Sequence, residues 1–181
     1  MNGVVSASMR QKGANYKINW GVSLAHLQEM AKSYGKDEEL AHELWKENIR
    51  ECKILATMIM PPTSMNKEKT TEWVTQIHTQ EIAELAAFHL FQHVEGIEHW
   101  ALDWLEIDSP LVRICAYHIL SSQFKQSMKM DENIDQRFLN HVSQSFKSDH
   151  AGERHAAMNA LNHYADIDEK HDQKAQKLYC F

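Results

Sequence analysis

The sequence predicts an all-α fold in which pairs of helices stack as a solenoid. Residue types that favour helices are abundant, whereas Gly and Pro number only 6 and 3 among 181 residues. No stretch alternates apolar and polar residues over enough positions to predict a β-sheet. Helix starts recur at intervals of roughly thirty residues, as expected for repeats of two helices joined by a short turn. These starts lie near Asp37, Asn66, Gly96 and Asp131.

The first helix is predicted to begin after Ser23 and to stop at Gly35. A serine hydroxyl can accept a hydrogen bond from a free N–H group of the first turn, and glycine is the usual residue just past a helix end. Apolar residues between these two recur at helical spacing and predict the buried face. They are Leu24, Leu27, Met30 and Ala31.

The second helix is predicted to start at Asp37, with Leu40, Leu44 and Trp45 pointing inward. A third runs from Ile49 to Met60 and is stopped by two consecutive prolines. The clearest later boundary is Asp108-Ser109-Pro110, where a capping serine precedes a proline at the first helical position. The remaining helices are predicted over residues 66–77, 79–93, 96–106, 110–124, 131–146, 149–164 and 168–178.

Composition restricts the class of protein. With 43% hydrophobic residues, a chain of 181 residues predicts one compact domain over residues 1–181. The three cysteines are widely separated and form no C-x-x-C pair, so we expect neither disulfides nor a cysteine zinc site, which fits a reducing cytoplasm. The longest apolar run, 54–60, is too short to cross a bilayer, so no membrane association is predicted. The net charge of -6 means that any contact with nucleic acid depends on a local basic patch.

Several segments carry a resemblance to a known family. They are Asn19-Trp20-Gly21-Val22-Ser23-Leu24, Leu40-Ala41-His42-Glu43-Leu44-Trp45, Arg50-Glu51-Cys52-Lys53-Ile54-Leu55-Ala56, Thr71-Glu72-Trp73-Val74, the Trp100/Trp104 pair and Leu111-Val112-Arg113-Ile114-Cys115-Ala116-Tyr117. Together they resemble the AlkD-like DNA alkylation-repair family. The resemblance implies HEAT-like helical repeats that form an α-α superhelix. In such stacks the second helix of each pair lines the concave face, so function is expected on the helices that begin near residues 49, 79, 110 and 149.

The resemblance also implies an activity and its residues. Characterised members are glycosylases of N3- and N7-alkylated purines, and they use a carboxylate to stabilise the positive sugar that forms as the base leaves. The family places a Trp and, four residues later, an Asp on the helix that matches residues 79–93. This chain has Gln80 and Glu84 there. The phosphate-holding Arg of the family aligns with Ile114, one residue after Arg113, and its second Trp falls at about Asn159. All four positions depart from the family pattern, and these departures predict weak or absent glycosylase activity.

Less specific interpretations apply to some of these residues. Glu84 and Glu81, three apart on a helix, are typical of a solvated face. Trp73, Trp100 and Trp104 are expected in the core. Two histidine spacings resemble metal-site motifs but lack further ligands, so neither a metal nor another cofactor is predicted. These spacings are His89/His93 and Glu39/His42.

Cations on the candidate concave helices and their flanks are the predicted DNA contacts. They are Arg50, Lys53, Arg113, Lys147 and Arg154. Aligned along a groove, such cations would bind the phosphate backbone without sequence preference and in a salt-dependent way. Isolated Lys and Arg on helices are also common as surface solubilisers. Two hypotheses follow: a DNA-repair protein that associates with duplex or damaged DNA, or a non-enzymatic scaffold for protein partners on the same solenoid.

Overall fold

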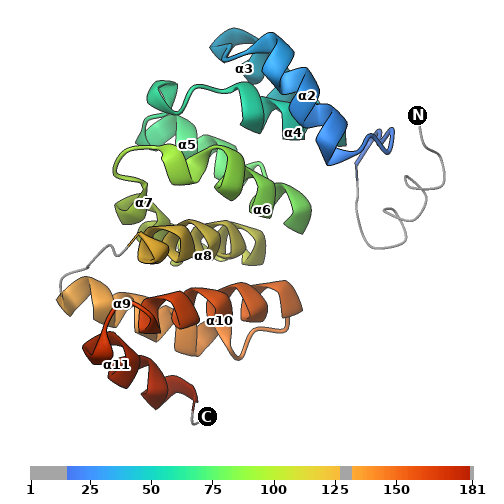
Figure 1. The fold of residues 1–181 in the computed structure, drawn as a ribbon. Coiled ribbons are helices and arrows are strands. Elements are labelled where there is room, and N and C mark those ends of the chain that lie inside the picture. Colours follow the sequence, from blue (N-terminus) through green and yellow to red (C-terminus); the bar gives the residue numbers. More distant parts are fainter. Residues whose placement is uncertain (1–15, 127–131, 180–181) are drawn as a thin grey trace. The chain divides into compact units, whose positions relative to one another are not determined.

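The computed structural model describes residues 16–126 and 132–179. Within them the chain forms ten α-helices and two short 3₁₀ helices (Figure 1). The described residues contain no β-strand, and their one β-bridge pairs Ile18 with Ile49 in parallel. The all-α prediction is therefore confirmed. The chain divides into two compact units, Met1–Glu95 and Gly96–Phe181.

Residues 16–95, the described part of the first unit, form five α-helices and both 3₁₀ helices. They are α2 (Leu24–Tyr34), α3 (Glu38–Lys46), α4 (Arg50–Ile59), η1 (Pro62–Ser64), α5 (Lys67–Thr75), α6 (Gln80–His89) and η2 (Phe91–His93). The predicted start and stop of the first helix are confirmed: Ser23 Oγ accepts a hydrogen bond from the His26 N–H, and Gly35 follows at φ 72°. The helix predicted over 79–93 ends instead at His89, because Leu90 leaves the helical conformation (φ -126°).

Helix α4 is covered on several sides. It packs against α2, α3 and α6, and eight of its ten residues are buried. The inward face predicted for α2 is narrower than expected, since Leu27 is buried but Met30 is 39% exposed. Helix α4 therefore presents little surface of its own to solvent.

Aromatic stacking anchors the core of the first unit. The rings of Trp45 and Trp73 lie parallel with centroids 4.3 Å apart, and His42 meets Trp73 edge-on at 5.6 Å. Trp73 is confirmed in the core at 1% exposure. Such stacked pairs contribute about 1 kcal/mol beyond the apolar area that they bury.

The second unit is built from five helices. They are α7 (Ile97–Trp104), α8 (Pro110–Lys125), α9 (Glu132–Ser145), α10 (Ala151–Ala165) and α11 (Glu169–Tyr179). Helix α8 packs against α7 and α10, and α10 also packs against α9 and α11. Trp104 lies in the core as predicted, but Trp100 is only half-buried. An aromatic cluster of Tyr117, Phe124, Phe138 and Tyr164 fills the interior.

One predicted cap is wrong. Pro110 takes the first helical position of α8, but the Ser109 side chain makes no cap hydrogen bond. The start of α8 is instead set by the fixed φ of proline and by a backbone bond from the Arg113 N–H to the Ser109 carbonyl at 3.0 Å. No helix in residues 16–126 or 132–179 combines the length and the apolar character that crossing a membrane requires.

Candidate nucleic-acid interface

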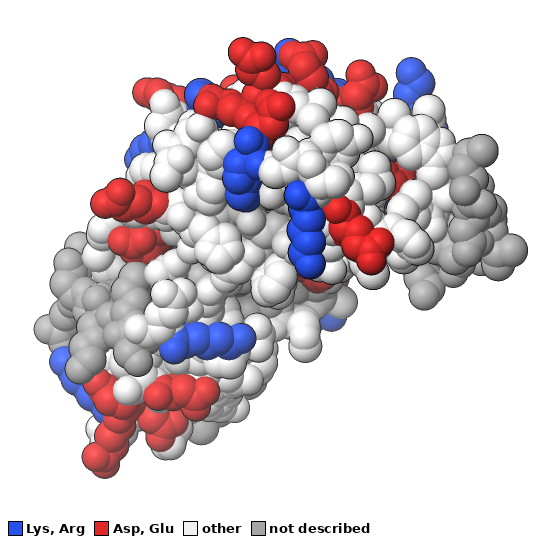
Figure 2. Space-filling view, turned by 45° about the horizontal axis from the view of Figure 1, so that its top comes forward, with Lys and Arg blue, Asp and Glu red and all other residues white. Residues whose placement is uncertain are grey.

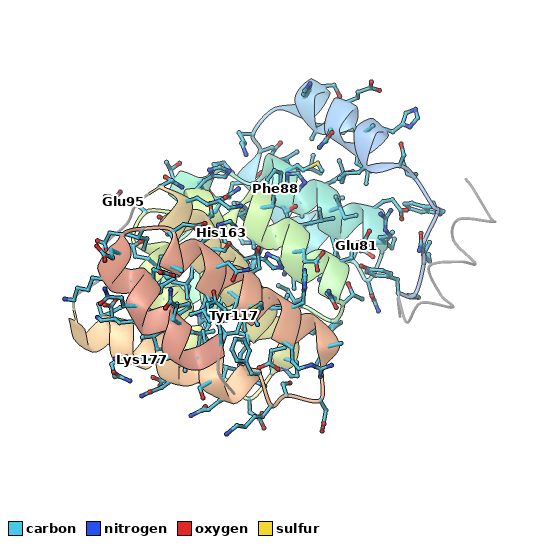
Figure 3. All side chains as sticks on the ribbon, turned by 60° about the horizontal axis from the view of Figure 1, so that its bottom comes forward. Glu81, Phe88, Glu95, Tyr117, His163 and Lys177 are labelled. Atoms are coloured by element: carbon cyan, nitrogen blue, oxygen red, sulfur yellow. The ribbon has the colours of Figure 1, made fainter. Side chains whose placement is uncertain are left out.

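Three side chains lie along one accessible stripe of α6 at four-residue spacing: Gln80, Glu84 and Phe88. The opposite side of the helix is buried. Thr79 caps the helix by accepting a hydrogen bond from the Ile82 N–H at 3.3 Å, which fixes the register of the stripe. Figure 3 shows Glu81 and Phe88 at the two ends of this helix. Gln80 and Glu84, which the resemblance matches to the family's Trp and Asp, are therefore neighbours on a surface that a ligand can reach.

The pair Gln80 and Glu84 does not reproduce the chemistry of Trp and Asp. The Gln80 amide donates a hydrogen bond of 2.8 Å to a carboxylate oxygen of Glu84, and Gln80 itself is exposed. An amide offers no aromatic face to a sugar, and here it occupies one lone pair of the carboxylate. The Glu84 charge is thus present but engaged by its neighbour. Orientation and preorganised charge must act together to stabilise a sugar cation.

The other two family positions also lack a catalytic environment. Ile114 is completely buried in α8. Asn159, on α10, is half-buried, and its amide donates to Ser121 Oγ at 3.4 Å. Neither side chain is placed to hold a phosphate or to stack on a sugar.

Arg50 belongs to a buried ion-pair cluster at the start of α4. Its guanidinium donates to both carboxylate oxygens of Glu81 on α6, at 2.6 and 2.8 Å, and to the Val22 carbonyl at 3.0 Å. A guanidinium nitrogen of Arg50 also lies 3.3 Å from a carboxylate oxygen of Glu51. The Glu51 carboxylate in turn accepts hydrogen bonds from the backbone N–H groups of Trp20 and Val22. Burial alone would lower the pKa of Arg50, but the bonds and charges of Glu81 and Glu51 outweigh burial and raise it.

Lys53 is also engaged within the fold. Its ammonium donates to the Trp45 carbonyl and lies 4.3 Å from the centroid of the Trp45 ring. Burial lowers the pKa of Lys53. Arg50 and Lys53 are only 3% and 8% exposed, so neither cation faces solvent as a DNA contact requires. The physical reason is that α2 and α3 cover α4, which the helical periodicity of α4 alone does not reveal.

A second ion pair, in which Glu153 is buried and Arg113 is partly exposed, joins α8 to α10. Arg113 donates to Glu153 at 2.7 and 3.2 Å and to the Ile107 carbonyl at 2.8 Å. The Glu153 carboxylate also accepts hydrogen bonds from the hydroxyls of Ser145 and Ser148, at 2.8 and 2.7 Å. Burial would raise the pKa of Glu153, but these three donors outweigh burial and lower it.

A polar pocket of about 310 Å³ surrounds this second pair. Its walls include cationic or titratable side chains, Arg113, Lys147 and His141, and the acids Glu106 and Asp108. Lys147 is exposed, and Arg154 is exposed nearby with its guanidinium 2.6 Å from the Ser148 carbonyl. The structure thus brings three of the five predicted DNA contacts to the turn between α9 and α10. Figure 2 shows individual basic side chains bordered by acidic and uncharged ones.

Some residues of the site were missed by sequence reasoning. The acidic partners Glu51 and Glu153 are two of them: Glu51 follows Arg50 directly on α4, whereas Glu153 lies on α10, away from Arg113 on α8. Phe88 was also missed, although its spacing from Gln80 and Glu84 is a helical repeat that could have revealed it. Among the described residues, no group of three or more His, Cys, Asp or Glu side chains is arranged to hold a metal ion.

Comparisons with known proteins agree with this architecture. The family model described as DNA alkylation repair enzyme matches residues 5–175. A solved structure from a family related to the HEAT-like repeat DNA glycosylases, with affinity for branched DNA structures, is similar at 17% identity and a TM-score of 0.80. That match covers 98% of this chain and 76% of the other, and it shows a HEAT-like repeat fold. No curated protein matches the chain. Because this family model matches nearly the whole length of the chain, the chain belongs to the DNA alkylation repair enzyme family.

Proposed function

We propose that this protein associates with duplex or damaged DNA without acting as an efficient glycosylase. The observation that carries the proposal is the α6 stripe, where the amide of Gln80 engages Glu84 at the two positions that match the family's catalytic pair. Family membership and the branched-DNA affinity of the similar protein support DNA as the partner. The free cysteines Cys52 and Cys115 support a cytoplasmic location, which is also part of the proposal.

The DNA contacts that we propose are Lys147 and Arg154. Both are exposed and flank the turn before α10, where phosphates could approach without breaking the Arg113–Glu153 pair. Arg113 would help to hold this turn in place, because it binds Glu153 and Glu153 accepts a hydrogen bond from Ser148 in the turn. Arg50 and Lys53 would stabilise the first unit and would leave phosphate binding to other cations.

Reversing both exposed charges should weaken DNA binding. Wild-type protein is expected to bind a short duplex weakly at about 50 mM salt and to lose affinity steeply as salt rises, because each phosphate contact releases counterions. Lys147→Glu with Arg154→Glu should remove most of that affinity and flatten the salt dependence. Fluorescence anisotropy across a salt series measures both effects.

A matched control for this variant is Lys32→Glu with Lys46→Glu, which makes the same change in net charge on exposed positions of α2 and α3. If the control loses as much affinity as the Lys147/Arg154 variant, only the net charge matters and the proposed contacts are wrong.

Base release should be close to the spontaneous rate. Duplex DNA that carries N7-methylguanine is expected to lose little or no base above background, and Glu84→Gln should change nothing, because no aromatic face positions the sugar beside Glu84. Chromatography of released bases over time measures the rate. Robust release that Glu84→Gln abolishes would show that Glu84 is a working catalytic carboxylate.

A protein-interaction scaffold is the second candidate function. It is favoured by the internal engagement of Arg50, Lys53 and Arg113, which leaves fewer cations for DNA, and by the net charge of -6. Complete absence of DNA binding at any salt concentration would support the scaffold over DNA association.

A further inference from the structure

We propose that Phe88 is a stacking platform for an unpaired base, so that the DNA bound by this protein is preferentially branched. This inference rests on the proposed DNA association and specifies the class of DNA. Phe88 is 63% exposed, whereas the aromatic residues Trp45, Trp73 and Trp104 are at most 2% exposed. A ring left in water forgoes hydrophobic free energy that burial would recover, and an exposed ring is available to stack on a ligand.

The Phe88 ring is held on a rigid support. The other face of α6 buries Ile82, Ala83 and Ala86, and the helix packs against α4. The His89 ring meets the Phe88 ring edge-on, with centroids 5.0 Å apart and an interplanar angle of 75°. Gln92 donates a side-chain hydrogen bond to the Phe88 carbonyl and so extends the helix end. A fixed ring loses little conformational entropy when a second flat ring stacks on it.

The surroundings of Phe88 suit a nucleotide better than an apolar protein surface. Phe88 is the one large hydrophobic side chain that α6 exposes. Its neighbours along the stripe are Glu84 and Gln80, both polar. Protein-docking sites usually bury a contiguous apolar patch, whereas base stacking needs a single π-face with polar groups around it.

Positive charge lies near His89, the residue that follows Phe88 on α6. The Lys36 ammonium donates to the carbonyls of Met58 and Met60, at 2.9 and 3.1 Å, which holds it beside the end of α4. Burial chiefly, and then the positive charge of the nearby His93 and Lys36, lower the pKa of His89. A phosphate that follows the stacked base would be attracted toward Lys36 and away from the Glu84 carboxylate.

The geometry favours an unpaired base over a paired one. In a duplex both faces of each base are covered by its neighbours, so a protein ring can stack only on a base that has left the helix. Branch points supply such bases without the cost of breaking a pair. The free energy of stacking depends little on which base is bound, because every base has a π-face.

The test uses the full chain and two DNA probes of equal nucleotide number: a three-way junction with 2-aminopurine unpaired at the branch, and a perfect duplex. Wild-type protein should bind the junction more tightly than the duplex and quench the 2-aminopurine fluorescence. Phe88→Leu keeps apolar bulk without a π-face and should lower junction affinity about tenfold while leaving duplex affinity within about twofold. Phe88→Trp should retain both the affinity and the quenching.

Tyr34→Ala is the matched control, since Tyr34 is a 56% exposed aromatic on α2 of the same unit. It should leave junction binding unchanged. Thermal unfolding by circular dichroism establishes that each variant is folded, and Phe88→Ala serves as a second substitution with the same expected loss as Phe88→Leu.

The outcomes separate the two proposals. If junction and duplex bind equally and Phe88→Leu changes neither, DNA association stands but the stacking platform is overturned. Full junction affinity in Phe88→Leu also overturns it, and that result would fit a docking site for an apolar protein segment. If neither probe binds at any salt, both proposals fail together.

Discussion

Arg113→Ala is expected to lower the free energy of unfolding by about 3 kcal/mol or more, because it leaves Glu153 buried without its cation. Glu153 is 2% exposed in the wild type, so its carboxylate depends on protein donors rather than on bulk water. The remaining Ser145 and Ser148 hydroxyls hydrogen-bond the carboxylate but carry no opposing charge. The midpoint of urea unfolding, compared at constant slope, measures the loss.

The matched control for Arg113→Ala is Arg137→Ala. Arg137 also bridges two acids of the second unit, Asp103 and Glu106, but these side chains are 38%, 46% and 57% exposed. Solvent screens such a pair, so its loss should cost less than about 1 kcal/mol. Equal losses in the two variants would mean that burial of Glu153 adds nothing to the pair.

The same pair should make stability depend on pH in a defined direction. The folded pKa of Glu153 is lowered, so its contribution is fully present above the unfolded-chain pKa of about 4.3 and is lost as the pH falls through the folded value. Wild-type protein should therefore lose stability in acid more steeply than Glu153→Gln, which has no carboxylate to protonate. Urea midpoints between about pH 6 and pH 3 measure the difference. If the urea midpoints of the two proteins fall in parallel as the pH is lowered, Glu153 is not the source of the pH dependence.

Arg50→Ala should have a comparably large effect on the first unit. Removing the guanidinium leaves Glu51, which is 2% exposed, with the backbone N–H groups of Trp20 and Val22 as hydrogen-bond donors but without its cation. It also frees Glu81 from α4. We expect a loss of about 3 kcal/mol and faster hydrogen exchange at the Trp20 and Val22 amides, because the segment before α2 is attached through Glu51.

DNA binding provides the contrast for Arg50→Ala. Under conditions in which the variant is still folded, its affinity for duplex DNA should match the wild type, whereas Lys147→Glu with Arg154→Glu loses affinity without losing stability. A folded Arg50→Ala protein with impaired DNA binding would show that Arg50 does reach phosphate.

Each unit contains one ion pair between neighbouring helices in which one member is buried, Arg50 in the first unit and Glu153 in the second. Arg50 lies at the start of α4 and pairs with Glu81 near the start of α6, while Arg113 lies in the first turns of α8 and pairs with Glu153 near the start of α10. In each case the cation joins the second helix of one repeat to the second helix of the next. Breaking either pair therefore separates neighbouring repeats, which is why we expect large effects on stability.

Local sequence signals determined the helices and the fold class. Ser23 and Gly35 bound a helix because a hydroxyl satisfies a free N–H group and because glycine tolerates positive φ, and both effects act within a few residues. The sequence also predicted that Trp73, Trp100 and Trp104 lie in the core. Trp73 and Trp104 do, whereas Trp100 is half-buried.

Only the tertiary structure decided which cations are available. Arg50 and Glu81 are 31 residues apart, and Arg113 and Glu153 are 40 apart, so no helical spacing connects them. Arg50 and Lys53 are basic residues on one helix and were predicted to form part of a basic surface. Helices α2 and α3 pack against α4, however, and both side chains are buried. Exposure of Phe88 was decided in the same way. Helical periodicity defines which residues share a face, but the neighbours that cover a face come from distant parts of the chain, and their packing free energy decides what remains for a ligand.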